Sequence, residues 1–167
     1  MPKSDHNAAH YFIETHLEAG RGEAMAFIET ASGKRISYST LSANTSKVAG
    51  ALTRAGIKRE ERAAILMPDS IDYVEVFWGC LKAGVIAVPI NTLLAGAVYD
   101  TILSDSRASC LFVSAALLQV VKPVLAKNDH IRKVIVVGDH PLEDGLDSYQ
   151  TFTQGAPEQF AVAARSD

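Results

Sequence analysis

The stretch AAILMPDSIDYVEVFWGCLKAGVIAVPINTLL, residues 63–94, decides the fold of this chain. An apolar run over residues 63–67 is followed by a polar break and then by a long apolar helical pattern that ends at Gly84. A second apolar run, residues 85–88, ends at Pro89. Strands that are apolar on both faces are typical of a parallel sheet covered by helices on both sides. The stretch therefore predicts a right-handed βαβ unit inside such a sheet.

The helix of this unit is apolar over most of its surface. Ser70 is placed to cap its first turn, and Asp72 and Glu75 lie near the positive end of the helix dipole. Residues 76–81, with the sequence VFWGCL, then leave no polar face over a turn and a half. Because such a helix packs on more than one side, we expect its outer face to be covered by this chain or by a partner.

The composition is that of an ordinary globular protein. The 167 residues suit a single domain, and 48% of them are hydrophobic while 21% are charged. The net charge of −3 and the scattered basic residues argue against a nucleic-acid or anionic-membrane surface. Cys80 and Cys110 are interpreted as small core residues in a reducing compartment. No signal peptide or apolar run of about 20 residues is visible, so we expect a cytoplasmic protein.

The remaining elements follow from periodicity and from turn residues. Before the central unit we expect a loose start over residues 1–5, a helix over residues 7–18, a β-hairpin with strands 24–29 and 35–39, and a helix over residues 40–55 that Ser39 or Thr40 caps and Gly56 ends. The inward residues of the first helix are expected to be Ala8, Tyr11, Phe12 and Leu17, and those of the second Leu41, Val48, Ala49 and Leu52.

After the central unit we expect a helix over residues 95–105 with Val98 and Ile102 inward, strands over 109–113 and 133–137, and a helix over 115–127 interrupted near Pro123. Residues 145–167 have weak periodicity and are interpreted as a linker. The predicted architecture is an α/β domain with a mostly parallel sheet, helices on both of its faces, and a small hairpin near the N-terminus.

Two short patterns suggest ligand sites that we do not assign. His6, His10 and Glu14 are spaced to share one helical face, but no further ligand motif accompanies them, so we interpret them as an exposed polar face. Gly33-Lys34 resembles part of a phosphate loop, but Arg35 follows and the next segment is a strand. We therefore assign no catalytic, cofactor-binding or metal-binding residue. The loop Pro89–Leu94, at the carboxyl end of a strand, is the one candidate near a functional site.

Three segments resemble a known family. They are residues 36–41 opening a helix that ends at 55–57, residues 64–70, and residues 77–84 followed by 87–91. Together they resemble the N-terminal part of the adenylate-forming acyl-CoA synthetases, the AMP-binding enzymes. The sequence Asn91-Thr92-Leu93-Leu94 resembles the corresponding loop of benzoate-CoA ligase and its relatives.

The resemblance implies a larger enzyme that joins an aromatic carboxylate to CoA through an acyl-adenylate and uses ATP, Mg²⁺ and CoA. In that family a phosphate loop ending in Pro-Lys follows such a linker, and the adenine site, the magnesium-binding glutamate, most of the acyl pocket and the catalytic lysine come later. The 167 residues are therefore expected to be inactive alone and to bind no cofactor. In some relatives an arginine of the loop contacts the CoA phosphate, and Leu93 stands at that position here.

Two other classes stay open at this stage. A free-standing flavodoxin-like or receiver-like module would need a phosphate loop or an acidic cluster, and bound FMN or metal in the purified protein would favour it. A non-enzymatic scaffold would use the apolar face of residues 76–81 as a dimer surface. If the chain is expressed alone, we expect exposed apolar surface and self-association.

Overall fold

A five-stranded parallel sheet forms the centre of the protein. The computed structural model describes residues 7–141 and 143–163. The strands stand in the order β4-β3-β5-β6-β7, and every neighbouring pair is parallel. Their bounds are Arg62–Leu66 for β3, Ile86–Pro89 for β4, Cys110–Ser114 for β5, Lys133–Val137 for β6 and Leu146–Ser148 for β7. The predicted parallel sheet is confirmed.

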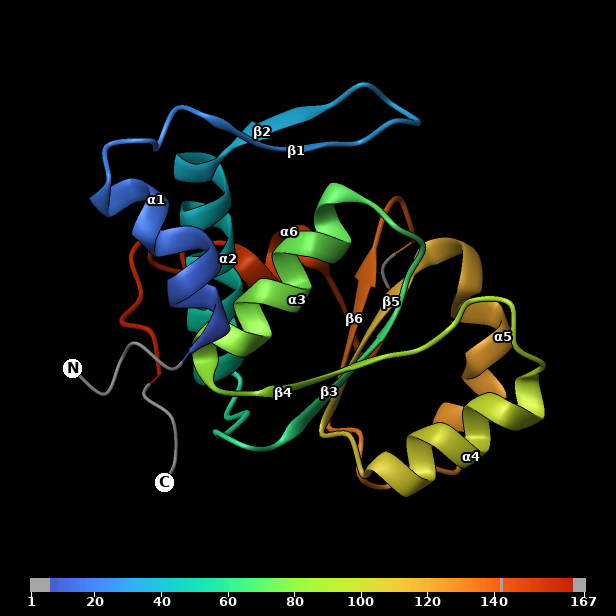
Figure 1. The fold of residues 1–167 in the computed structure, drawn as a ribbon. Helices are drawn as coiled ribbons and strands as arrows, with labels where there is room; N and C mark the ends of the chain where they lie inside the picture. The colour runs from blue at the N-terminus through green and yellow to red at the C-terminus, as the bar shows by residue number, and fades with distance from the viewer. Residues whose placement is uncertain (1–6, 142, 164–167) are drawn as a thin grey trace.

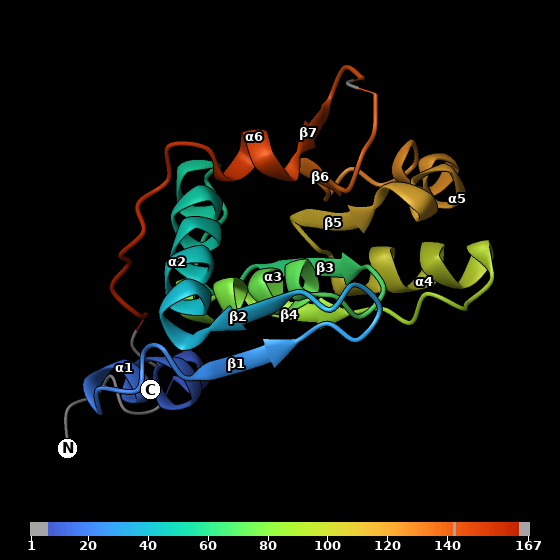
Figure 2. The ribbon, with the colours of Figure 1, turned by 90° about the horizontal axis from the view of Figure 1, so that it is seen from above.

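Helices cover both faces of this sheet (Figures 1 and 2). One layer contains α2 (Tyr38–Arg54), α3 (Ile71–Ala83) and α6 (Tyr149–Thr153), and the other contains α4 (Gly96–Ser106) and α5 (Ala115–Leu125). Along β3 the side chains alternate between the two cores, with Ile65 packing toward α2 and α3 and Leu66 packing toward α4 and α5. The predicted three-layer α/β arrangement is therefore present.

The central unit has the predicted order, but its second strand differs from the first. β3 is buried from Ala63 onward, whereas β4 is an edge strand with Ile86 and Pro89 exposed. The prediction that both strands are buried on both faces is wrong for β4, because β4 has a neighbour on one side only. An edge position also explains why Pro89, which has no N–H to donate, can stand within the strand.

The ends of α3 follow the predicted cap residues. The Oγ of Ser70 accepts a hydrogen bond from the N–H of Tyr73 at 3.1 Å. Gly84 ends the helix with φ +74°, a left-handed conformation that glycine adopts without a Cβ clash. Gly79 allows α2 to approach closely, since a Cβ on it would lie 2.5 Å from the Cβ of Val48. Thus α2 covers one flank of α3 and the sheet covers another.

The hairpin and α2 agree with the prediction except at their junction. β1 (Met25–Ile28) and β2 (Arg35–Ser37) are antiparallel, as expected. The N-cap of α2 is Ser37, whose Oγ accepts from the N–H of Thr40, so the predicted caps Ser39 and Thr40 are wrong. The second strand is correspondingly shorter than expected, because the helix begins at Tyr38. All four predicted inward residues of this helix are buried.

The first helical segment has a different inward face from the predicted one. It contains a π-helix, η2 (His10–Glu14), followed by α1 (Thr15–Glu18). Ala9 and Ile13 are buried, whereas Tyr11 is 63% exposed and Phe12 is 54% exposed. The prediction assumed α-helical periodicity, and the wider π turn changes which residues share a face.

Two predictions for the downstream helices are also wrong. In α4 the buried residues are Tyr99 and Leu103. Of the predicted inward pair, Ile102 is half-buried and packs against this core, whereas Val98 is 40% exposed. Pro123 does not interrupt α5, because it lies in the last turn, two residues before the helix ends at Leu125.

The stretch predicted as a linker contains two further elements. β7 extends the sheet beside β6, and α6 places Phe152 in the core, where its ring centroid lies 5.8 Å from that of Phe112. The chain then passes along α2, with Pro157 beside Gly50, and the N–H of Ala163 donates to the carbonyl of Lys82 at 2.9 Å. Residues 146–153 are therefore part of the domain.

Both cysteines are free and buried, which confirms their interpretation as core residues. Burial raises the pKa of each thiol, and the pKa of Cys110 rises to about 12, so both thiols stay protonated and unreactive at neutral pH. Among the helices in residues 7–141 and 143–163, none is long and apolar enough to cross a bilayer.

Candidate functional site

A groove at the carboxyl end of the sheet is the candidate functional site. Ligands of open α/β sheets bind beyond the carboxyl ends of the strands, and here the chain leaves β3 and β4 at that edge. The groove has a volume of about 470 Å³. Its lining residues are Met67, Pro68, Asp69, Tyr73, Pro89, Ile90, Asn91 and Thr92. The first four residues of the predicted candidate loop Pro89–Leu94 thus form one wall.

Both ends of this loop are held in place. The N–H of Ile90 donates to the carbonyl of Ile65 at 2.9 Å and so extends the pairing of β4 with β3. The Oδ1 of Asn91 accepts from the N–H of Leu93 at 2.8 Å, and Leu94 packs against the core beside α4. Between these anchors Leu93 is 90% exposed. An apolar side chain therefore stands at the outer end of the loop.

The opposite wall of the groove carries a phenol and a carboxylate. Burial raises the pKa of Tyr73, and the nearby charge of Asp69 raises it further. The phenol is therefore neutral at physiological pH and can donate a hydrogen bond. The Tyr73 ring also stacks on Phe77 with centroids 6.4 Å apart. This wall is suited to contact with an aromatic or apolar group.

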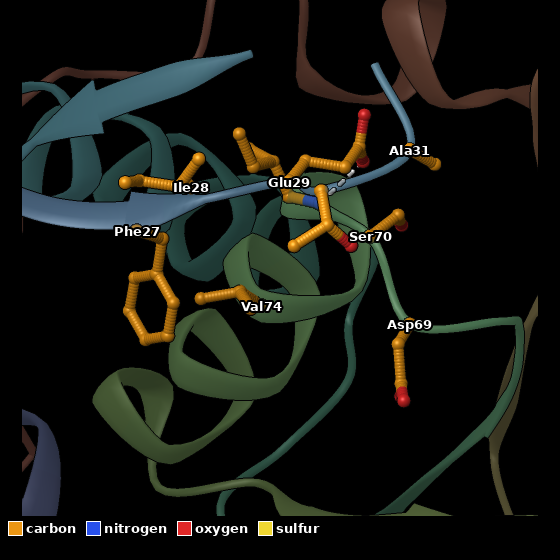
Figure 3. A pocket seen from close by; sticks show the side chains of 9 residues that line it. Phe27, Ile28, Glu29, Ala31, Asp69, Ser70 and Val74 are labelled. Atoms are coloured by element: carbon orange, nitrogen blue, oxygen red, sulfur yellow. Dashed lines mark hydrogen bonds between the residues drawn. The ribbon is translucent and has the colours of Figure 1, made fainter. Parts of the chain in front are cut away.

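A second hollow lies between the hairpin and the start of α3 (Figure 3). Its volume is about 210 Å³, and it is lined by Phe27, Ile28, Glu29, Thr30, Ala31, Asp69, Ser70, Ile71 and Val74. The Oε1 of Glu29 accepts from the N–H of Ile71 at 3.1 Å, so a carboxylate from the hairpin occupies the positive end of α3. Hydrogen bonds from Ser32 and then Ile71 lower the pKa of Glu29. The helix end is therefore already satisfied by the chain itself.

A buried ion pair on α3 was not predicted from the sequence. Lys82 is 1% exposed, and its ammonium pairs with the carboxylate of Glu14 in η2. The Lys82 Nζ also donates to the Oγ of Ser46 at 2.9 Å and to the carbonyl of Ser42 at 3.2 Å. The Ser42 hydroxyl in turn donates to Glu14. This cluster joins three helical segments, η2, α2 and α3.

A buried carboxylate, Glu75, lies on the same flank of α3, two helical turns before Lys82. It accepts from the Nδ2 of Asn44 at 2.7 Å and from the hydroxyl of Tyr149 at 3.0 Å. Burial raises the pKa of Glu75 despite these two hydrogen bonds. The signal that sequence reasoning missed is the spacing of Glu75, Gly79 and Lys82, which puts all three on the flank of α3 that faces α2.

Neither the His6, His10 and Glu14 pattern nor Gly33-Lys34 forms a ligand site among the described residues. Glu14 forms an ion pair with Lys82 in the buried cluster. The Nε2 of His10 lies 3.9 Å from the Oε1 of Glu18, and His6 lies outside the described residues. Within residues 7–141 and 143–163, no group of three or more His, Cys, Asp or Glu side chains could hold a metal ion. Gly33-Lys34 connects β1 to β2, so the strand-to-helix geometry of a phosphate loop is not formed there.

The chemistry available in the groove is limited. Its lining side chains include one carboxylate, one phenol, one amide and one hydroxyl, and no Lys, Arg or His is among them. Phosphoryl and adenylyl transfer need cationic groups or metal ions over developing negative charge. These lining residues can contact a substrate or a neighbouring segment, but they do not form a complete phosphate-binding site.

The amino-acid sequence is similar to those of known enzymes. The family model described as AMP-binding enzyme matches residues 14–165. A 4-hydroxybenzoate–CoA/benzoate–CoA ligase of Rhodopseudomonas palustris is 36% identical over 84% of the chain, and a benzoate–CoA ligase of Thauera aromatica is 33% identical over 95% of it.

The fold is also similar to solved structures of aryl-CoA ligases. An anthranilate CoA ligase, AuaEII, crystallised with anthranoyl-AMP, superposes with a TM-score of 0.88 and 28% identity over 98% of this chain. A benzoate CoA ligase from Burkholderia xenovorans LB400 superposes with a TM-score of 0.82 and 29% identity over 96%.

The chain spans 26% and 29% of the two curated relatives, and 32% and 30% of these two structures. The similarity thus covers nearly all of this chain and less than a third of each relative.

Proposed function

The chain belongs to the AMP-binding enzyme family, and we propose that it forms the N-terminal part of an ATP-dependent aryl-CoA ligase. The observation that carries this proposal is the identity of 33–36% to benzoate-type CoA ligases over 84–95% of the chain. Family membership leaves the flavodoxin-like and receiver-like alternatives without support. Because ATP and CoA are the co-substrates of such a ligase, we also propose that the whole protein is cytoplasmic.

The proposed reaction has two steps. The carboxylate of an aromatic acid attacks the α-phosphorus of ATP, which releases pyrophosphate and leaves an acyl-adenylate. The thiol of CoA then attacks the acyl carbon and displaces AMP, which yields the acyl-CoA and a proton. A whole enzyme of this class uses Mg²⁺ with ATP. The lining of the groove has a single carboxylate and no cationic side chain, so these residues would not hold Mg²⁺ and the phosphates by themselves.

We propose that this domain supplies one wall of a larger active site. The groove lies where open α/β sheets bind ligands, its half-buried Tyr73 presents aromatic surface, and Leu93, which follows the lining residue Thr92 in the same loop, is exposed. The reacting groups would come from the polypeptide that follows residue 167. In this view the chain after α6 leads from the domain to that polypeptide, and the 167 residues alone do not catalyse the reaction.

A pyrophosphate-release assay tests the proposal. The whole protein and the 167-residue chain are each supplied with ATP, Mg²⁺, CoA and benzoate, and a reaction without acid serves as the blank. We expect benzoate-dependent pyrophosphate release and benzoyl-CoA from the whole protein, and a blank rate from the 167 residues. Turnover by the 167 residues would overturn the proposed division of the site. A whole protein that activates no aromatic acid would overturn the substrate class.

A further inference from the structure

The turn between β3 and α3 separates two hollows. Asp69 lines both the hollow beside the hairpin and the groove of the candidate site. On the groove side, Met67, Pro68 and Tyr73 belong to the same wall. On the hollow side, Glu29 of the hairpin reaches the start of α3 (Figure 3). Contacts made in the hollow are therefore close, along the chain, to the wall of the groove.

Glu29 caps α3 from a distant part of the chain. Its Oε1 accepts a hydrogen bond from the N–H of Ile71, the first residue of the helix, at 3.1 Å. The Oγ of Ser70 caps the same turn by accepting from the N–H of Tyr73 at 3.1 Å. Within the described part of the chain, no other side chain from outside α3 and its N-cap hydrogen-bonds to residues 67–73. This one carboxylate therefore ties the hairpin to the turn.

The Glu29 carboxylate is itself held in place by the hairpin. It accepts a hydrogen bond from the hydroxyl of Ser32, whose Oγ in turn accepts from the N–H of Lys34 at 3.1 Å. The Glu29 N–H donates to the carbonyl of Lys34 at 2.9 Å. Because hydrogen bonds from Ser32 and then from Ile71 lower the pKa of Glu29, the carboxylate is ionised at neutral pH and complements the positive end of α3.

We propose that Glu29 is a positioning residue for the candidate site, because it fixes the first turn of α3 and thereby the place of Asp69 and Tyr73 in the wall of the groove. The inference rests on the proposed function, in which this groove is part of the active site. Each of these two wall residues is two positions from Ile71, where Glu29 bonds. A misplacement of about 1 Å in such a wall can cost about 100-fold in rate.

Amide hydrogen exchange of the 167-residue chain tests the positioning step. Glu29→Met removes the acceptor at similar length, whereas Glu29→Gln keeps an acceptor oxygen and removes the charge. The N–H groups of Tyr73 and Val74 are the readout, because both bond to Ser70 and neither bonds to Glu29. We expect Glu29→Met to speed their exchange by about 2–30-fold, as for loss of a helix cap, and Glu29→Gln to leave it within about twofold.

Two controls separate a local effect from a general one. The N–H of Phe112, in the buried strand β5, reports global unfolding and should exchange at the same rate in every variant. Glu23→Met removes an exposed carboxylate just before the hairpin and should leave the exchange of α3 unchanged.

Kinetics of the whole protein test whether the position of the wall matters for the reaction. A merely structural role would lower stability and leave each KM unchanged, whereas a smaller fraction of correctly placed wall raises KM for the substrate that contacts it. Because no cationic side chain lines the groove, that substrate presents an uncharged aromatic or amide surface, which benzoate and CoA both carry. We expect Glu29→Met to raise KM for one of these two by about threefold or more, with kcat and KM for ATP within about twofold, and Glu29→Gln to restore the wild-type value.

Three results would overturn the inference. Faster exchange of Ile71 alone, with Tyr73 and Val74 unchanged, would show that Glu29 bonds to the helix without fixing it. An equal increase at Phe112 would show a loss of global stability instead. Unchanged KM values for benzoate and CoA in Glu29→Met would show that the reaction does not depend on this contact. The proposed function is read separately, from benzoyl-CoA formation by the unsubstituted whole protein.

Discussion

Replacing Glu14 with Gln should strongly destabilise this domain. The substitution keeps the shape of the side chain and removes the charge that balances the ammonium of Lys82. That ammonium would keep its hydrogen bonds to Ser46 and to the carbonyl of Ser42, but it would be a buried charge with no counter-ion. The Lys82 side chain is 1% exposed and that of Glu14 is 19% exposed, so water can replace little of the lost interaction.

The expected cost follows from this burial. Removing one partner of a buried ion pair costs about 3–5 kcal/mol, and the partial exposure of Glu14 favours about 3 kcal/mol. Urea unfolding of the 167-residue chain measures it, and with a slope of about 1–3 kcal/mol per molar the midpoint should fall by about 1–3 M. The matched control is Glu18→Gln in the next turn, where the side chain is 63% exposed and the change should stay within about 0.5 kcal/mol.

A second variant separates the charge from the packing. The double variant Glu14→Gln/Lys82→Met removes both charges and should recover most of the lost stability, because an apolar side chain needs no counter-ion. A loss below about 1 kcal/mol for Glu14→Gln, the value typical of an exposed pair, would refute the reasoning. A double variant no more stable than the single one would refute it as well.

Three further substitutions test other parts of the structure. Gly84→Ala should cost about 1–2 kcal/mol in a thermal unfolding measurement, because φ is +74° and the new Cβ would lie 3.0 Å from that of Ala163. Phe152→Ala should cost about 3–5 kcal/mol in urea unfolding, whereas a change near zero would mean that α6 is not part of the core. Burial raises the pKa of Glu75, so the folded state holds that proton more tightly and Glu75 lowers stability as pH rises above the ordinary glutamate pKa of 4.5. Glu75→Gln should therefore gain stability over the wild type at pH 7, and unfolding curves should show that gain shrinking toward pH 4.5.

The sequence predicted the parts of the fold that local chemistry determines. Ser70 and Gly84 bound α3 because a hydroxyl cap and a left-handed terminus are properties of single residues. The strands β3, β5 and β6 were visible as apolar runs because they are buried on both faces.

The errors arose where tertiary context decides. β7 was missed because its three residues are half-buried and carry no apolar run, and only pairing with β6 makes them a strand. The inward face of the first helix was wrong because this segment contains a π turn, in which Ile13 is buried and Glu14 pairs with the distant Lys82. β4 is an edge strand, and Pro89 at its end was the one sequence signal for that position, because a residue without an N–H is confined to sheet edges and bulges.

The candidate site could be located from the sequence but not described. The position of Pro89–Leu94 after a strand was enough to predict a place at the carboxyl edge of the sheet. The opposing wall formed by Asp69 and Tyr73 depends on how the β3–α3 turn folds, and the occupancy of the α3 N-terminus by Glu29 depends on a contact over 42 residues. Periodicity carries no information about such contacts.

The central claim is that this chain is the N-terminal wall of an aryl-CoA ligase, and a graft tests it most directly. This chain replaces the segment of the Thauera aromatica benzoate–CoA ligase that aligns with 159 of its residues, and benzoyl-CoA formation is measured beside a thermal unfolding curve. We predict a folded chimera that forms benzoyl-CoA from benzoate, ATP and CoA. A chimera that unfolds as cooperatively as the parent enzyme but forms neither benzoyl-adenylate nor benzoyl-CoA would contradict the claim.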